Sequence, residues 1–141
     1  MEEVTKMRKG FTLVELLIVM AIIGVLASIG IGSFMTAQMR GRDAQRKSDL
    51  KQISHALELY YSDYRKYPPT TSIVWGSEFT DGKTVYFKVL PSDPVTSQSY
   101  TYTLPDSPTN QKFRLSAELE NTQDKLYPIL YVTSANTNAT E

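Results

Sequence analysis

The segment from Phe11 to Met39, FTLVELLIVMAIIGVLASIGIGSFMTAQM, decides the fold of this 141-residue chain. Twenty of its 29 residues are apolar, and Glu15 is its one charged residue. As a helix the segment would be about 43 Å long, whereas the hydrocarbon core of a bilayer is about 30 Å thick. The apolar region of a cleaved secretory signal has about 7–15 residues, roughly half this length. The segment therefore predicts a helix that spans a membrane.

The composition of the whole chain excludes several classes of chemistry. The chain has no cysteine, which excludes disulfides, thiolate metal sites and thiol catalysis. The chain has a single histidine, His55, so a metal site with several histidine ligands is excluded. A position on a helix surface explains this residue. The 15 basic and 15 acidic residues balance, so bulk charge does not favour a nucleic-acid partner. The residues thus indicate a protein that has no catalytic site, metal or cofactor.

The start of the apolar segment carries a capping signal. Thr12 followed by Glu15 matches the capping box, in which a Thr and a Glu three residues later satisfy free amides of the first helical turn. Capping explains a Glu at a helix start, but a carboxylate within a membrane is costly, by about 2.5–3 kcal/mol, and usually has a partner. Glu15 is therefore a candidate for a second role.

Small residues recur every four positions along the same segment. Gly24, Ser28 and Gly32 lie on one stripe of the predicted helix. Such stripes allow two helix backbones to approach closely, which is a main attraction between helices in lipid. The stripe therefore predicts that this helix packs against other helices.

The stretch from Lys9 to Leu17, KGFTLVELL, resembles the processing signal of type IV prepilins and of the pseudopilins of type II secretion. The resemblance implies that a prepilin peptidase cuts between Gly10 and Phe11 and methylates the new amino terminus of Phe11. It also implies that Glu15 pairs with the amino terminus of a neighbouring subunit during assembly. The implied partners are the peptidase, other pilin or pseudopilin subunits, an inner-membrane assembly platform and membrane lipid.

The leader, residues 1–10, differs from the compact basic leaders of the family because it starts with acidic residues, and Met7 is an alternative start. Basic residues lie on both sides of the apolar segment, so charge counting does not decide the orientation. The resemblance places the leader in the cytoplasm and the head on the outer side of the membrane. It implies a single-pass inner-membrane protein that later enters a surface or periplasmic filament.

Residues 40–67 predict an amphipathic continuation of the helix. Leu50, Ile53, Leu57, Tyr60 and Tyr64 fall on one helical face, and the prolines at 68 and 69 predict that the helix ends after Tyr67. The basic stretch 40–51 is interleaved with aspartates, which favours an ion-paired or solvated surface over contact with lipid headgroups or neighbouring subunits. Residues 40–66 sum to +3 and residues 67–141 to −3, so the two parts suit contact with each other.

Residues 68–132 predict a small β-sheet head, followed by a polar tail over 133–141. β-Branched and aromatic runs predict strands over 84–90, 100–104, 113–119 and 127–132, with loops over 70–83 and 91–99. Pro128 predicts an edge position or a late start for the last strand. The expected fold class is α+β: a long N-terminal helix, membrane-spanning in its first half, whose second half packs on an antiparallel sheet. This order resembles the pilin head.

Several polar and aromatic groups of the head have structural explanations. Alternation around Phe113 predicts that Glu118 and Glu120 lie on a solvent face and do not form a catalytic pair. Tyr60, Tyr61, Tyr64 and Tyr67 are explained by packing. Asp93-Pro94 resembles a feature of the G-type pseudopilins, but Asp124 has no carboxylates near it in the sequence, so a calcium site is not predicted.

These observations predict a structural subunit, a pilin or minor pilin of a type IV-like surface filament. Its helix over 11–39 would form the filament core. The alternative is a G-type pseudopilin of a type II secretion system. A third and different class is an uncleaved membrane-anchored binding module, which an intact leader on the purified protein would favour.

The leader motif generates a prediction about processing. Because Gly10 precedes the aromatic residue and the Glu of the helix start, we expect the mature chain to begin at methylated Phe11. A bulky residue in place of Gly10 should block the cut sterically and leave the precursor in the membrane. Intact-mass analysis of filament protein tests this, and residues 1–10 still attached to that protein would contradict it.

Overall fold

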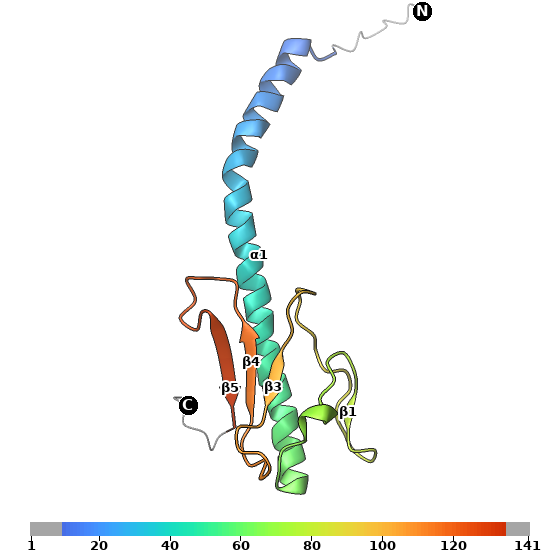
Figure 1. The fold of residues 1–141 in the computed structure, drawn as a ribbon. Helices are drawn as coiled ribbons and strands as arrows, with labels where there is room; N and C mark the ends of the chain where they lie inside the picture. The colour runs from blue at the N-terminus through green and yellow to red at the C-terminus, as the bar shows by residue number, and fades with distance from the viewer. Residues whose placement is uncertain (1–9, 135–141) are drawn as a thin grey trace, which may run out of the picture. The chain divides into compact units, whose positions relative to one another are not determined.

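The computed structural model describes residues 10–134, apart from the side chains of residues 29 and 30, and its fold is α+β (Figure 1). Most of the leader, residues 1–9, and most of the predicted tail, residues 135–141, lie outside the described residues. The chain divides into two compact units, one up to Ala37 and the other from Gln38. A long helix followed by small antiparallel sheets is the architecture that the sequence predicts.

The helix α1 extends from Leu13 to Tyr64 and contains 52 residues. Within the first unit the large apolar side chains that the structure describes are exposed, and Leu16, Ile22 and Phe34 are each more than half exposed. In the described part of the chain no single helix meets the length and hydropathy of a membrane span, whereas one bent pair, Leu13–Ser28 with Ile31–Tyr64, meets them by length and composition.

The second half of α1 supplies the helical side of the core of the head. The predicted apolar face is confirmed at Leu50, Ile53 and Leu57, which are at most 1% exposed. Tyr64, assigned to the same face, is 42% exposed because it is the last residue of the helix. Its ring stacks on that of Tyr60, with 4.6 Å between the ring centroids. Along the helix, this face therefore changes from fully buried aliphatic side chains to stacked tyrosine rings.

The helix ends at Tyr64, three residues earlier than the sequence predicts. The reason is Arg65, which adopts a positive φ of 56° and donates its N–H to the carbonyl of Tyr61 at 2.8 Å. A residue in the left-handed region ends an α-helix in this way. Tyr67 is already outside the helix, where its N–H donates to the carbonyl of Asn110 at 2.7 Å. The two prolines therefore follow the helix and do not end it directly.

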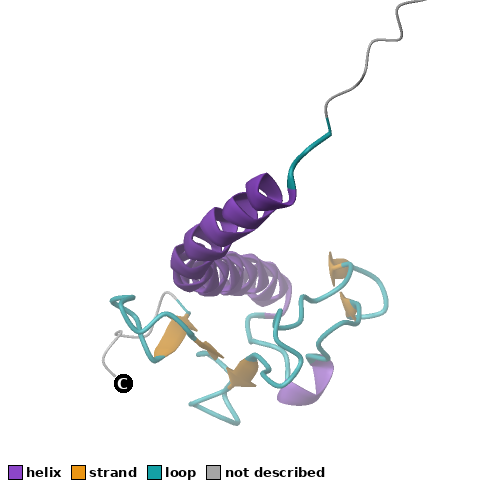
Figure 2. Ribbon diagram, turned by 90° about the horizontal axis from the view of Figure 1, so that it is seen from above, coloured by secondary structure: helices purple, strands orange, loops and turns teal. Residues whose placement is uncertain are grey.

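Two antiparallel sheets complete the head. One pairs β1 (Phe79–Thr80) with β2 (Val85–Phe87), and the other has the order β3 (Thr101–Thr103), β4 (Arg114–Glu118) and β5 (Ile129–Thr133). Figure 2 shows the strands on one side of the second half of α1. β5 is an edge strand that begins directly after Pro128, which confirms the prediction from that proline.

Two boundaries predicted from the sequence are wrong, one of a loop and one of the tail. Residues 70–83 are not only a loop, because they contain a 3₁₀ helix, η1 (Thr70–Ser72), and the strand β1. A strand of two residues is too short to produce a readable alternation, so no sequence pattern reveals it. The tail also begins later than residue 133, because Thr133 belongs to β5 and Ser134 is buried.

The central strand β4 supplies the sheet side of the core. Phe113, Leu115, Ala117 and Leu119 are at most 5% exposed, which confirms the predicted alternation. Aromatic rings extend this core as predicted: Tyr60, Tyr61 and Tyr67 pack on one another or on neighbouring rings, and the Trp75 ring meets the ring of Tyr100 edge-on at 5.8 Å. His55 is exposed on the helix surface. The head is thus a helix face covered by aromatic and aliphatic strand residues.

Candidate processing and assembly site

The residues around the predicted cut form a capped helix start. The Thr12 N–H and hydroxyl both donate to Glu15 Oε2 at 2.8 Å, and the Glu15 N–H donates to Thr12 Oγ1 at 3.2 Å. This reciprocal pair is the capping box that the sequence predicts. Gly10 and Phe11 precede the first helical residue and are exposed, Phe11 by 91%. The peptide bond between them therefore lies outside the helix, in the accessible position that a peptidase needs.

The stripe of small residues faces open space. A Cβ added at Gly24 or at Gly32 would have no neighbouring heavy atom within 4 Å apart from its own helix. The Ser28 hydroxyl donates to the carbonyl of Val25 at 2.7 Å, so this polar group is satisfied within the helix. This face is open, its side chains are small, and its hydroxyl group is already hydrogen-bonded, so a second helix can approach it closely. Its role in packing stays a prediction.

In the head, the structure places a buried arginine that sequence reasoning missed. The Arg46 side chain is fully buried, and a guanidinium has five N–H donors. Each donor has an acceptor within 2.9 Å: two on Asp93 and one each on Asp43, Gln98 and Glu120. These hydrogen bonds and charges raise the pKa of Arg46, with the Asp93 carboxylate as the largest cause. The basic stretch is therefore ion-paired as predicted, but its centre lies inside the head and not on its surface.

Asp43 connects the same network to the backbone after β4. It accepts the N–H groups of Glu120 and Asn121 at 3.0 and 2.8 Å, in addition to Arg46. Asp49, six residues further along the helix, accepts the Tyr100 hydroxyl at 2.7 Å. Each buried aspartate of the helix thus binds a different segment of the head. Buried charges of this kind must be paired to be tolerated.

The prediction that Glu120 lies on a solvent face is wrong. Its carboxylate accepts two hydrogen bonds from Arg42 and forms an ion pair with Arg46, whereas Glu118 is exposed as predicted. Alternation ends with Leu119, and the chain then turns towards the helix, so the pattern of β4 does not extend to Glu120. Hydrogen bonds from Arg42, followed by the field of Arg46, lower the pKa of Glu120 to about 2.

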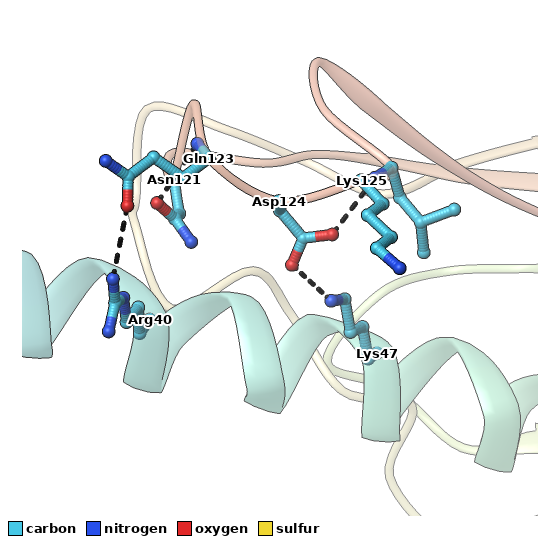
Figure 3. A pocket seen from close by; sticks show the side chains of 7 residues that line it. Arg40, Lys47, Asn121, Gln123, Asp124 and Lys125 are labelled. Atoms are coloured by element: carbon cyan, nitrogen blue, oxygen red, sulfur yellow. Dashed lines mark hydrogen bonds and ion pairs between the residues drawn. The ribbon is translucent and has the colours of Figure 1, made fainter.

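Two further cations of the helix contact the loop between β4 and β5. Lys47 donates to Asp124 at 2.5 Å, and Arg40 donates to the amide oxygen of Gln123 at 3.3 Å (Figure 3). The expected contact between the +3 segment and the −3 head is thus confirmed, through Arg42, Arg46 and Lys47. The charge segregation along the sequence was the one signal that pointed to it. Among residues 10–134, no group of three or more His, Cys, Asp or Glu side chains is placed to hold a metal ion.

Comparison with known proteins identifies the N-terminal segment as a prokaryotic N-terminal methylation motif, over residues 5–31. The type IV major pilin protein PilA of Myxococcus xanthus is 42% identical over 59 residues, which are 42% of this chain and 27% of that pilin. Type II secretion system core protein G of Escherichia coli is 33% identical over 99 residues, which cover 64% of this chain and 68% of that protein.

Core protein G of Vibrio cholerae is 32% identical over 127 residues, 80% of this chain and 84% of that protein. No solved structure matches. The chain belongs to the family of type IV pilins and type II secretion pseudopilins. The matches extend beyond the methylation motif into the head, so the family is supported by more than the leader signal.

The lowered pKa of Glu120 generates a prediction about pH. A depressed carboxyl pKa stabilises the fold above the ordinary value of 4.5, and this stabilisation is lost as the pH falls towards 2. We expect Glu120→Gln to lower the free energy of unfolding by about 1.5–3 kcal/mol at pH 7. The difference from wild type should shrink between pH 4.5 and pH 2.

Thermal unfolding over this pH range measures the effect. Glu118→Gln is the matched control, because it makes the same change of charge at an exposed position two residues away. A Glu120→Gln variant whose pH profile matches that of Glu118→Gln would contradict the assignment.

Proposed function

We propose that this protein is a structural subunit, a pilin or minor pilin, of a type IV-like filament. The observation that carries the proposal is the exposed Gly10–Phe11 junction directly before a capped helix that contains Glu15 and then a long apolar stretch. A prepilin peptidase would cut this junction and methylate Phe11. The chain is then the substrate of the peptidase and a building block, and it catalyses no reaction itself.

Residues 11–39 would store the subunit in the inner membrane before assembly. The exposed apolar side chains of this segment support the proposal, since they bury nothing within the chain. The leader would lie in the cytoplasm and the head outside. During assembly the same side chains would exchange lipid for the helices of neighbouring subunits, with the open stripe of Gly24, Ser28 and Gly32 at the closest approach. An inner-membrane platform would drive this exchange.

Glu15 would set the register of neighbouring subunits. Cleavage creates an ammonium group at Phe11, which attracts a carboxylate far more strongly in a low dielectric than in water. In the described chain both hydrogen bonds that the Glu15 carboxylate accepts end on Oε2, which leaves Oε1 for a donor from a neighbour. Buried ion pairs are better attested as determinants of register than as net stabilisers. Glu15 would therefore align a subunit with the amino terminus of the next.

The second candidate is a G-type pseudopilin of a secretion system. The coverage of the relatives favours it, because the matches to core protein G extend over 68% and 84% of two such proteins but only 27% of the Myxococcus pilin. Both candidates share cleavage, methylation and assembly. Imaging of surface filaments in cells with and without the gene separates them, since a pilus subunit is required for a surface filament.

Substitution of Glu15 tests the assembly role. Glutamine retains the capping geometry, because an amide also closes a capping box, but removes the charge. We expect Glu15→Gln to be cleaved normally and to assemble poorly. The loss of charge also lowers the free-energy cost of placing the helix in lipid, which favours the unassembled protein in the membrane. The measurement is the ratio of sheared filament protein to membrane-retained protein.

Thr12→Ala is the matched control, because it removes the capping hydroxyl and keeps the Glu15 charge. It should weaken the cap by about 1 kcal/mol and leave assembly near the wild-type ratio. An unchanged ratio for Glu15→Gln, with processing intact, would leave Glu15 as a cap alone.

A further inference from the structure

An open cleft lies at the edge of the head, between the first turns of its helix and the loop that joins β4 to β5. Its volume is about 660 Å³, and it is lined chiefly by Arg40, Lys47, Asn121, Gln123, Asp124 and Lys125. Figure 3 shows the two helix cations facing the loop, with the Asn121 and Lys125 side chains directed from the loop towards the helix. The cleft is thus bordered by cations from both sides.

The positive charge of this cleft exceeds what its own carboxylate neutralises. Asp124 is the acidic residue among its lining groups, and it is already bound to Lys47 and to the N–H of Leu126. The Lys47 contact is the main cause of the lowered pKa of Asp124, so this carboxylate stays ionised and paired. Arg40 meets a neutral amide oxygen at 3.3 Å, and Lys125 is exposed. Arg40 and Lys125 therefore leave two positive charges in the cleft.

We propose that this cleft binds a phosphate group, through Arg40 and Lys125, with amide donors from Asn121 and Gln123. Guanidinium and ammonium groups are the usual protein partners of phosphate oxygens. The same chemistry is offered by free phosphate and by the headgroup of a membrane phospholipid. The position of the cleft along the chain favours the headgroup.

Arg40 directly follows the apolar segment 11–39. If that segment spans a membrane, as the proposed function states, Arg40 lies at the membrane surface, so this step of the inference rests on the proposed function. A helix of this length extends about 43 Å, and a bilayer with its headgroups is about 40–45 Å thick. The cleft then begins at the level of the headgroups. Leu126 and Tyr127 in the same loop are 48% and 45% exposed, and tyrosine is enriched at membrane interfaces. A bound headgroup would hold the head of a stored subunit against the membrane.

The test uses the full chain in nonionic micelles, with nuclear magnetic resonance of the backbone amides of residues 121–126. Three probes are titrated separately: dihexanoylphosphatidylglycerol, dihexanoylglycerol, which has the same acyl chains without the phosphate, and inorganic phosphate. We expect saturable shifts with the phospholipid and none with dihexanoylglycerol. Weaker binding of inorganic phosphate would assign the site to a headgroup.

The variant Arg40→Gln with Lys125→Gln removes the two free charges and retains the ion pair of Lys47 with Asp124. Each cation near an anionic lipid surface contributes about fivefold, so the double variant should bind about 25-fold more weakly. The control is Lys83→Gln with Lys88→Gln, which makes the same change of charge at two exposed positions, one in the β1–β2 turn and one directly after β2. It should bind within about twofold of wild type.

Inorganic phosphate that binds as tightly as the phospholipid would support the phosphate site and overturn its assignment to lipid. The inference is overturned if no probe gives a saturable shift, or if both double variants lose binding equally. It is also overturned if the same amides respond only to protein concentration, which would indicate a carboxylate of a second subunit. Cleavage at Phe11 is read separately by mass, so a cleaved chain without phosphate binding refutes this inference and leaves the proposed function intact.

Discussion

The head of this protein depends on one buried positive charge. Arg46 has no solvent exposure, and its five donors reach four side chains, which come from the helix, from the segment before β3 and from the second residue after β4. Desolvating a guanidinium costs several kcal/mol, so the fold tolerates it only while these acceptors stay in place. The arrangement fixes which turn of the helix each loop contacts. An apolar face alone fixes this less well, because apolar contacts have no direction.

The two parts of α1 have different roles in the structure. From residue 38 onwards the head is held to its own helix by the Arg46 network and by the core around Leu57 and Leu115, both fully buried. The large apolar side chains described before residue 38 take no part in that core and are exposed. The proposed function would require this division, because the same apolar helix would contact lipid first and other subunits later, while the head stays folded throughout. The family relationship and the physical arrangement therefore agree.

Features with a regular period were predictable, and features that depend on a long-range partner were not. The face through Leu50 and Leu57 and the alternation around Leu115 follow from periods of 3.6 and 2, which the sequence displays directly. The burial of Arg46 depends on Asp93, 47 residues away, and no local pattern encodes such a partner. The early end of α1 depends on a positive φ at Arg65, a residue type that rarely adopts it. In the candidate site, the cap at Glu15 was predictable because both of its partners lie within one turn.

The unfolding free energy of an Arg46→Met variant tests this account most directly. The measurement is thermal unfolding of the full chain at pH 7, monitored by the near-ultraviolet circular dichroism of its tyrosines. Arg40→Met is the control at an exposed position on the same helix. Methionine leaves Asp43 and Asp93 buried without their cation, so the variant should lose about 3–5 kcal/mol of stability. Arg40→Met should change it by less than about 0.5 kcal/mol. An Arg46→Met protein as stable as the control would contradict the claim that this charge holds the head to its helix.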